Sequence, residues 1–202
     1  MASATFFYAC LLDNGFLFLV FSVICLFSQN NNETSFLLDM KPKVYIVIYG
    51  RGGHQEQMLR LCRHGLFKNV PNEQLIAFTD SETPITETIG KTIHFREFRD
   101  KYSRLKTLVF LPFNVIKLVY KSFEMMVRYD IRGVIVTGPG VAIIPSIIFS
   151  LFRKKLVVFE TWSKYYKGSL TGRVLYRFAG LFLIQNKSLK KIYPDAQYLG
   201  RL

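Results

Sequence analysis

A glycine-rich turn could bring a phosphate group close to the backbone of this chain. The turn, Gly50-Arg51-Gly52-Gly53-His54, directly follows a strongly apolar run. Glycines allow close approach of a ligand, and a helix that starts here would offer its free N–H groups to an anion. Arg51 and His54 could both contact a phosphate, and His54 could act as a general base near neutral pH. The turn lacks the spacing of dinucleotide folds and the Lys-Ser/Thr of a P-loop, so a tight turn of purely structural purpose is the alternative.

A second turn of similar character follows another apolar run. Its residues are Thr137, Gly138, Pro139 and Gly140, and the proline makes it rigid. A ligand-binding turn and an ordinary strand-to-helix connection both fit this pattern.

A carboxylate follows a third apolar run. Glu160 comes after four apolar residues, with Thr161 next to it, so we expect it at the end of a strand. Such a carboxylate could orient a sugar hydroxyl or accept a proton. A salt bridge with Lys164 or Arg173 is the alternative.

Alternating strands and helices must position these residues. Strands are expected at 44–49, 74–78, 93–95, 133–137, 156–159 and 181–185, and helices at 55–65, 105–128, 141–152, 170–179 and 186–192. This order predicts an open, mostly parallel α/β sheet with helices on both faces. Ligands bind such sheets beyond the carboxyl ends of the strands. Residues 50–54, 137–140 and 160–164 all fall at such ends, so we expect one site at that rim.

The predicted helix at 105–128 has more apolar residues than one face of a surface helix needs, and Pro112 should break or kink it. Basic residues flank or interrupt it: Lys101, Arg104, Lys106, Lys117 and Lys121. This pattern suits a helix in a membrane interface, with lysines reaching the headgroups. A core helix packed on both sides is the alternative.

Composition limits the class of protein. Of the 202 residues, 50% are hydrophobic and 20% are charged, which excludes a disordered chain. The three cysteines lie far apart, which argues against a disulfide scaffold or a four-ligand zinc site. All 27 basic residues but only 11 of the 14 acidic ones follow residue 40, giving that part a formal charge of +16. It should therefore have an anionic partner: nucleic acid, anionic lipid headgroups or a phosphorylated substrate.

The first 40 residues predict a membrane anchor and a polar linker. Residues 6–27 are apolar apart from Asp13, Asn14 and small residues, and this 22-residue stretch is long enough to span a bilayer. A cleaved signal peptide and a docked helix are the alternatives, although no basic residue precedes Lys41. The positive-inside rule places the body, residues 41–202, in the cytosol.

Several stretches together resemble the asparagine-linked-glycosylation protein fourteen family. They are the turn at 50–54 with Met58-Leu59, the turn at 137–140 with Pro145, Glu160-Thr161, and the segments 170–176, 183–185 and 193–201. Members of this family are membrane-anchored subunits of the transferase that adds the second N-acetylglucosamine to dolichyl-diphosphate-linked N-acetylglucosamine. The resemblance covers about residues 41–202.

The resemblance implies a fold and separate roles for two subunits. The body would be a single Rossmann-like sheet, one half of a GT-B glycosyltransferase, and a separate catalytic subunit (protein thirteen in the eukaryotic pair) would bind the UDP-sugar. The rim and the apolar helix would hold the lipid-linked acceptor, with Arg51 and the glycine turn facing its diphosphate. His54 or Glu160 would help to activate the attacking hydroxyl. No metal or other cofactor is implied, and the protein would be a single-pass protein of the endoplasmic reticulum membrane.

Some residues depart from the family pattern, and other functions remain open. Arg51 stands where the family commonly has Ser, Gln57 where it has Glu, and Thr161 where it has Ser. Gln57 and the loop after Glu160 are also similar to bacterial exopolysaccharide subunits that transfer glucuronic acid or galactose. A non-catalytic membrane scaffold is a further alternative. A nucleic-acid binder is disfavoured, because the basic residues are scattered and an anchor would serve no purpose.

Overall fold

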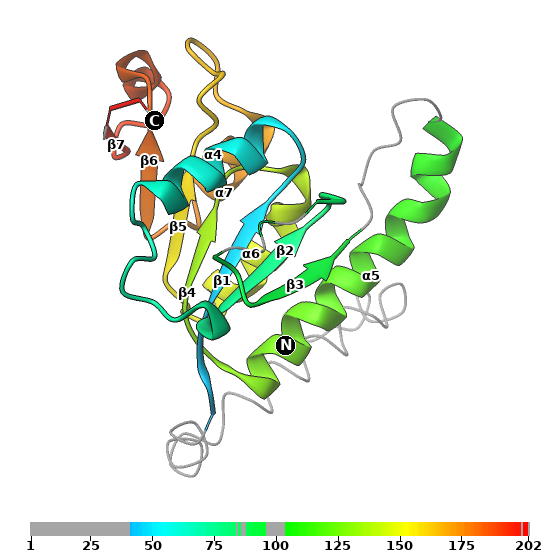
Figure 1. Ribbon diagram of the computed structural model, residues 1–202. Helices are drawn as coiled ribbons and strands as arrows, with labels where there is room; N and C mark the ends of the chain where they lie inside the picture. Colours follow the sequence, from blue (N-terminus) through cyan, green and yellow to red (C-terminus); the bar gives the residue numbers. More distant parts are fainter. Residues whose placement is uncertain (1–40, 84, 86–87, 96–103, 199, 202) are drawn as a thin grey trace, which may run out of the picture. The chain divides into compact units, whose positions relative to one another are not determined.

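Seven parallel strands form one open sheet in the part of the chain that the computed structural model describes (Figure 1). The described residues are 41–202, without residues 84, 86–87, 96–103, 199 and 202. The strands are β1 (Lys43–Tyr49), β2 (Leu75–Thr79), β3 (Lys91–His94), β4 (Asp130–Val136), β5 (Leu156–Phe159), β6 (Leu181–Ile184) and β7 (Gln197–Tyr198). Their order in the sheet is β3-β2-β1-β4-β5-β6-β7, and every neighbouring pair is parallel. The predicted open parallel α/β sheet is confirmed.

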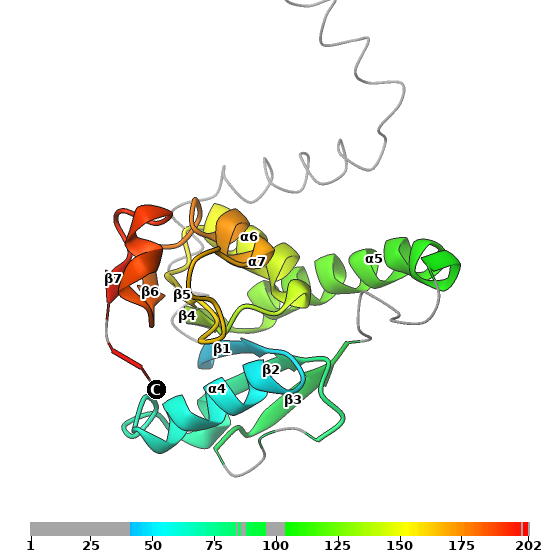
Figure 2. The same cartoon turned by 90° about the horizontal axis from the view of Figure 1, so that it is seen from above.

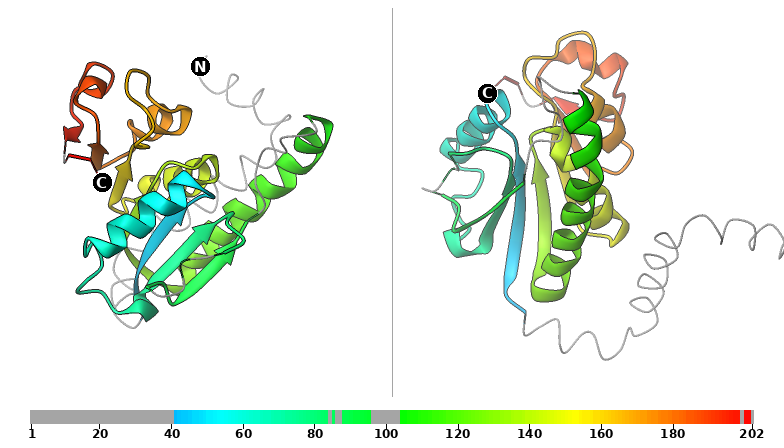
Figure 3. Two further views of the ribbon diagram at one scale, coloured as in Figure 1. Left: turned by 45° about the horizontal axis from the view of Figure 1, so that its top comes forward. Right: turned by 90° about the vertical axis from the view of Figure 1, so that its right-hand side faces the viewer.

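Helices cover both faces of this sheet. They are α4 (Gly53–Arg63), α5 (Arg104–Arg128), α6 (Ile143–Leu151) and α7 (Leu170–Leu175), with short 3₁₀ turns at Asn72–Gln74, Gly140–Ala142 and Lys187–Lys191. Figures 2 and 3 show α4 on one face and α5 and α6 on the other. The helices therefore form the two outer layers around the sheet.

The alternation of side chains along β1 divides the core in two. Ile46 and Ile48 pack with α5 and α6, while Val47 and Tyr49 pack with α4, and all four are fully buried. A strand covered on both faces needs apolar residues at every position rather than at alternate ones. The continuous apolar run of β1 is explained by this double burial.

Most predicted elements lie within a few residues of their observed bounds, and the differences are local. Pro112 does not interrupt α5, which continues through it as one helix. The helix expected at 170–179 ends at Leu175, and that expected at 186–192 is a 3₁₀ turn over Lys187–Lys191. The sequence did not predict β7, because two exposed residues carry no strand pattern. The N-terminal anchor expected at 6–27 lies outside the described residues, and none of the helices that can be described is long and apolar enough to cross a membrane.

The chain order places a topological switch point between β1 and β4. The chain runs outward from β1 through β2 to β3, returns through α5 to β4, and then runs outward through β5 and β6 to β7. Loops after β1 and β4 diverge from such a point and leave a crevice at the carboxyl ends of the strands. Both glycine turns follow these two strands.

Candidate functional site

The two glycine turns lie on one rim, as the sequence predicted, and they meet there at the switch point. A Cβ added to Gly50 would lie 2.7 Å from the Cβ of Pro139, so the two turns touch at this position. Gly138 has a φ of 87°, in the left-handed region that favours glycine, and a Cβ there would be in ordinary contact with the His54 ring, 3.5 Å from its Cε1. Gly50 therefore serves the close packing of one turn on the other, and Gly138 serves the backbone conformation of its turn.

Gly52 and Gly140 instead border open space. No heavy atom of the residues that the structure describes lies within 4 Å of a Cβ added to either glycine. Gly52, with a φ of 64°, precedes α4, and no side chain caps that helix. The first N–H groups of a helix have no acceptor within the helix, and together with the helix dipole they favour a bound anion. The start of α4 can therefore hold a phosphate group.

His54 joins the two turns and presents one free ring position. Its Nδ1 lies 2.5 Å from the carbonyl oxygen of Thr137, and the Thr137 hydroxyl donates to the His54 carbonyl over 3.0 Å. A carbonyl oxygen only accepts, so Nδ1 carries the proton and Nε2 carries the lone pair. This tautomer gives His54 the form that a general base requires.

Burial keeps the His54 ring neutral. Desolvation lowers the pKa of His54 below 6.5, while the bond to Thr137 and the charges of Asp80 and Glu160 partly oppose this shift. At neutral pH the imidazole is therefore uncharged and able to accept a proton.

Arg51 is bonded to the segment that follows β2. Its Nε donates to the Asp80 carbonyl over 2.8 Å, and its Nη2 to a Glu82 carboxylate oxygen over 2.6 Å. Its backbone N–H donates to the Asp80 side chain over 2.9 Å. The Arg51 and Glu82 side chains are 49% and 82% exposed, and such an ion pair contributes at most about 1 kcal/mol. The guanidinium can therefore leave Glu82 for a stronger anion at modest cost.

The Glu160 carboxylate is buried and engaged by donors of the protein itself. It accepts from the N–H of Thr161 over 2.9 Å, from the N–H of Ser169 over 3.3 Å and from the hydroxyl of Tyr193 over 2.7 Å. Glu160 is only 1% exposed. Among the described residues it forms no ion pair with Lys164 or Arg173. The carboxylate thus ties the start and the end of the 160–169 loop to the C-terminal segment.

Two glycines make room for this buried network. A Cβ on Gly172 would lie 2.1 Å from a Glu160 carboxylate oxygen, and one on Gly168 would lie 2.0 Å from the Tyr193 hydroxyl oxygen. Gln57 of α4 also joins the region, because its side-chain amide donates to the Glu160 carbonyl over 3.1 Å. Thr161, 8% exposed, begins the loop that these contacts fix.

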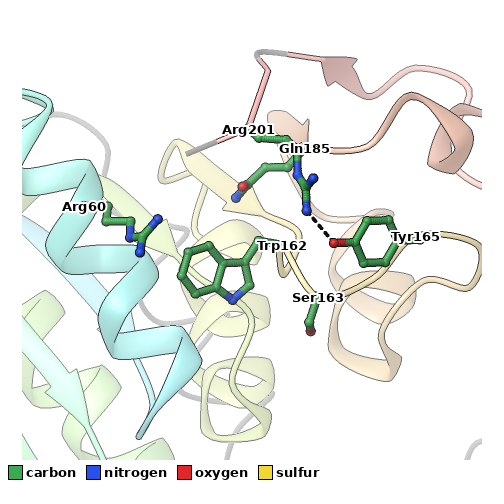
Figure 4. Close-up of a pocket in the computed structure, with 6 residues that line it drawn as sticks. All are labelled: Arg60, Trp162, Ser163, Tyr165, Gln185 and Arg201. Carbon is green, nitrogen blue, oxygen red and sulfur yellow. Dashed lines mark hydrogen bonds between the residues drawn. The ribbon is translucent and has the colours of Figure 1, made fainter.

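The structure adds a pocket to which the sequence analysis gave no role. A cavity of about 360 Å³ is lined by Arg60, Trp162, Ser163, Tyr165, Gln185 and Arg201 (Figure 4). The signal that could have indicated it is Trp162, the single tryptophan of the chain, in the rim segment at 160–164. Ser163 and Tyr165 belong to the same loop as Trp162. The remaining members come from α4, from the end of β6 and from the C-terminal segment, which no local pattern connects.

No cluster of three or more His, Cys, Asp or Glu side chains that could hold a metal ion occurs in the described ranges.

Comparisons with known proteins agree with this geometry. A family model described as "Oligosaccharide biosynthesis protein Alg14 like" matches residues 45–202. The UDP-N-acetylglucosamine transferase subunit ALG14 of Kluyveromyces lactis is 26% identical over 188 residues, covering 81% of this chain and 80% of that protein. The Homo sapiens protein of the same name is 23% identical over 179 residues, covering 78% and 82%.

A solved structure shares the fold. The crystal structure of Acinetobacter baumannii MurG aligns with a TM-score of 0.51 and 16% identity, covering 71% of this chain and 41% of that one. This chain thus spans about two fifths of the MurG chain. At this identity the similarity concerns the fold alone.

Proposed function

This chain belongs to the Alg14 family, and on that premise we propose that it is the acceptor-binding, membrane-anchoring subunit of a UDP-N-acetylglucosamine transferase. The acceptor is a lipid diphosphate that carries one N-acetylglucosamine, and the reaction adds a second. A separate catalytic subunit brings the UDP-sugar, in keeping with the word "subunit" in the names of the relatives.

The observation that carries this proposal is the pair of glycine turns at the switch point. Gly52 and Gly140 border open space, and α4 starts there without a side-chain cap. A diphosphate is a doubly anionic group that backbone N–H groups at a helix start bind well. Arg51 can turn from Glu82 to the diphosphate and add a charge-assisted hydrogen bond.

His54 supplies the base in this proposal. Its Nε2 accepts the proton of the attacking sugar hydroxyl while the hydroxyl oxygen forms the new glycosidic bond to the anomeric carbon of the donor sugar. The bond between that carbon and the diphosphate of the donor breaks in the same step, and UDP leaves. The carbonyl of Thr137 keeps the ring in the required tautomer. Glu160 takes a positioning role, because its carboxylate already accepts from three donors of this chain.

A transfer assay tests the proposed function. The full chain is co-expressed with a candidate donor-binding subunit, and membrane fractions receive UDP-N-acetylglucosamine and a diphosphate-linked N-acetylglucosamine lipid. Transfer that requires both chains is the expected result. UDP-glucuronic acid and UDP-galactose serve as competing donors, and preference for either would overturn the proposed donor. If the partner transfers the sugar without this chain, the chain is not required for the reaction and acts only as a membrane scaffold.

Helix α5 provides a surface for the membrane in this proposal. Its inner face packs on the sheet through Leu118 and Met125, which are buried. Its outer face exposes Phe113, Ile116 and Tyr120 by 68%, 51% and 64%. Over residues 112–128 the helix is therefore packed on one side and exposed on the other. This differs from the alternative of a core helix that is packed on both sides.

We expect a tryptophan placed on this face to contact lipid. In vesicles that contain phosphatidylserine, brominated acyl chains should quench the added tryptophan of Tyr120→Trp, because an interfacial helix buries its apolar face about 5–10 Å deep. The matched control is Leu66→Trp, in the loop after α4 on the opposite face of the sheet, where 39% of the side chain is exposed. Equal quenching at both positions would show that α5 has no special contact with the bilayer.

A further inference from the structure

The pocket around Trp162 continues the proposed diphosphate site along α4. The Nε1 of Trp162 lies only 3.4 Å from the position that a Cβ on Gly53, the first residue of α4, would occupy. Arg60 lies seven residues further along the helix, about 10 Å at 1.5 Å per residue. The pocket therefore begins beside the helix start that the diphosphate would occupy.

The walls of the pocket are held in place before any ligand arrives. The guanidinium of Arg60 lies over the Trp162 ring, 4.5 Å from its centroid, and its Nε is bonded to Glu56 over 2.9 Å. Asn186 fixes the loop that carries Trp162, because its amide donates to the Lys164 carbonyl over 2.6 Å. Ser188 donates to the carbonyl of Tyr165. A rigid wall binds a ligand without the entropy cost of ordering loops.

The far side of the pocket is formed by Arg201 and Tyr165. The Arg201 guanidinium donates to the Tyr165 hydroxyl and lies 5.2 Å from the centre of that ring. In the view of Figure 4, Trp162 lies between Arg60 and this pair. One face of the indole is thus covered by Arg60.

The chemistry of the walls fits a sugar ring. The C–H groups of a pyranose carry partial positive charge and pack well on the electron-rich face of an aromatic ring. Guanidinium, amide and hydroxyl groups of Arg201, Gln185 and Ser163 could bond to sugar hydroxyls or to an acetamido group. A volume of about 360 Å³ is near the lower end of ligand pockets, about 300–1,000 Å³, and suits one sugar better than a nucleotide sugar.

We propose that this pocket is the subsite for the sugar of the lipid diphosphate, with the sugar ring against Trp162. The proposal rests on the proposed function, because it takes the diphosphate to lie at the start of α4. The Trp162 indole lies beside Gly53, which directly precedes His54 in the chain. A sugar against Trp162 would therefore lie next to the turn that carries the imidazole.

Trp162 itself reports on the pocket, because the chain has one tryptophan. The full chain, purified in detergent, is titrated with a short polyprenyl diphosphate that carries N-acetylglucosamine, while tryptophan emission is recorded and binding is measured separately by equilibrium dialysis. The same diphosphate without the sugar and UDP-N-acetylglucosamine are the comparison ligands. We expect the sugar-linked diphosphate to bind and change the emission, and the sugar-free one to bind with the emission unchanged.

Other outcomes overturn the proposal in distinguishable ways. Binding of the sugar-linked diphosphate without an emission change would overturn the subsite and leave the proposed function intact. The same emission change with the sugar-free diphosphate would assign the pocket to phosphate, and a change with UDP-N-acetylglucosamine alone would assign it to the donor. Failure of both diphosphates to bind would overturn the proposed function as well.

Substitutions at the far wall give a second test that keeps the reporter. Arg201→Gln and Tyr165→Ala should each weaken the binding of the sugar-linked diphosphate by roughly tenfold, about the effect of one charge-assisted hydrogen bond. The affinity for the sugar-free diphosphate should remain unchanged. The matched control is Tyr166→Ala, in the next residue of the same loop, which is 84% exposed and does not line the pocket. An equal loss of affinity for both ligands, or no loss of affinity, would contradict the assignment of the pocket to the sugar.

Discussion

The substitution His54→Asn is expected to lower kcat of the assembled transferase by about 10²–10⁴-fold, the usual contribution of a general base. The amide nitrogen of asparagine matches the position of Nδ1, so the hydrogen bond to the Thr137 carbonyl should persist. Only the lone pair at Nε2 is lost. The fold and the affinity for a diphosphate ligand should therefore remain close to those of the wild type, which equilibrium dialysis and thermal unfolding would check.

The pH dependence gives the same prediction an independent readout. Because burial lowers the pKa of His54 below 6.5, the base stays unprotonated at neutral pH, and the activity should fall only as the pH drops through this lowered value. The residual activity of His54→Asn should lack this limb of the profile. The same shift also makes stability fall below about pH 6.5, because the unfolded chain then binds the proton more readily than the folded one. A kcat unchanged by His54→Asn would exclude the imidazole as the base.

That the two turns lie on one rim of the sheet could be predicted from the sequence, because it follows from the parallel direction of the strands. Apolar runs buried on both faces identify β1 and β4, and the carboxyl ends of parallel strands meet at one edge. The turns at 50–54 and 137–140 follow those runs directly, so their place on the same rim needed no knowledge of side-chain contacts. Their direct contact depends on the pairing of β1 with β4, which the structure shows.

The directions of the charged side chains could not be predicted in this way. Arg51 pairs with Glu82, thirty-one positions further along the chain, and Glu160 with the Tyr193 hydroxyl, thirty-three positions further along. Such contacts depend on how loops from different strands fold over the rim. The sequence placed Glu160 correctly at a strand end, but burial and the choice among donors are set by the tertiary structure.

Helix α5 shows the same limit for an apolar pattern. An excess of apolar residues fits burial on both sides and also burial on one side with an unpartnered outer face. The structure shows the latter for residues 112–128, where Leu118 is buried and Phe113 is exposed. Periodicity alone cannot separate these cases, because both place apolar residues around most of the helix.

Loss of the Glu160 carboxylate is expected to destabilise the domain strongly, whatever its effect on turnover. Glu160→Ala removes the acceptor of three donors, of which the Thr161 N–H and the Tyr193 hydroxyl are buried. A buried donor left without a partner costs about 1–3 kcal/mol, so the free energy of unfolding should fall by about 3 kcal/mol or more. Against a total of about 5–15 kcal/mol this is a large loss. Urea unfolding of the full chain in detergent would measure it.

Tyr193→Phe separates the structural role of this carboxylate from a chemical one. It removes one donor and keeps the carboxylate, so it should cost about 1–2 kcal/mol of stability and leave kcat unchanged in the folded protein. Glu56→Gln is the matched control, because that carboxylate is 41% exposed and its loss should cost less than about 1 kcal/mol. If Glu160→Ala kept its stability but lost turnover, the carboxylate would act on the substrate directly. We expect instead that Glu160→Ala mainly lowers the stability, because the carboxylate oxygens already accept from the Thr161 and Ser169 amides and the Tyr193 hydroxyl.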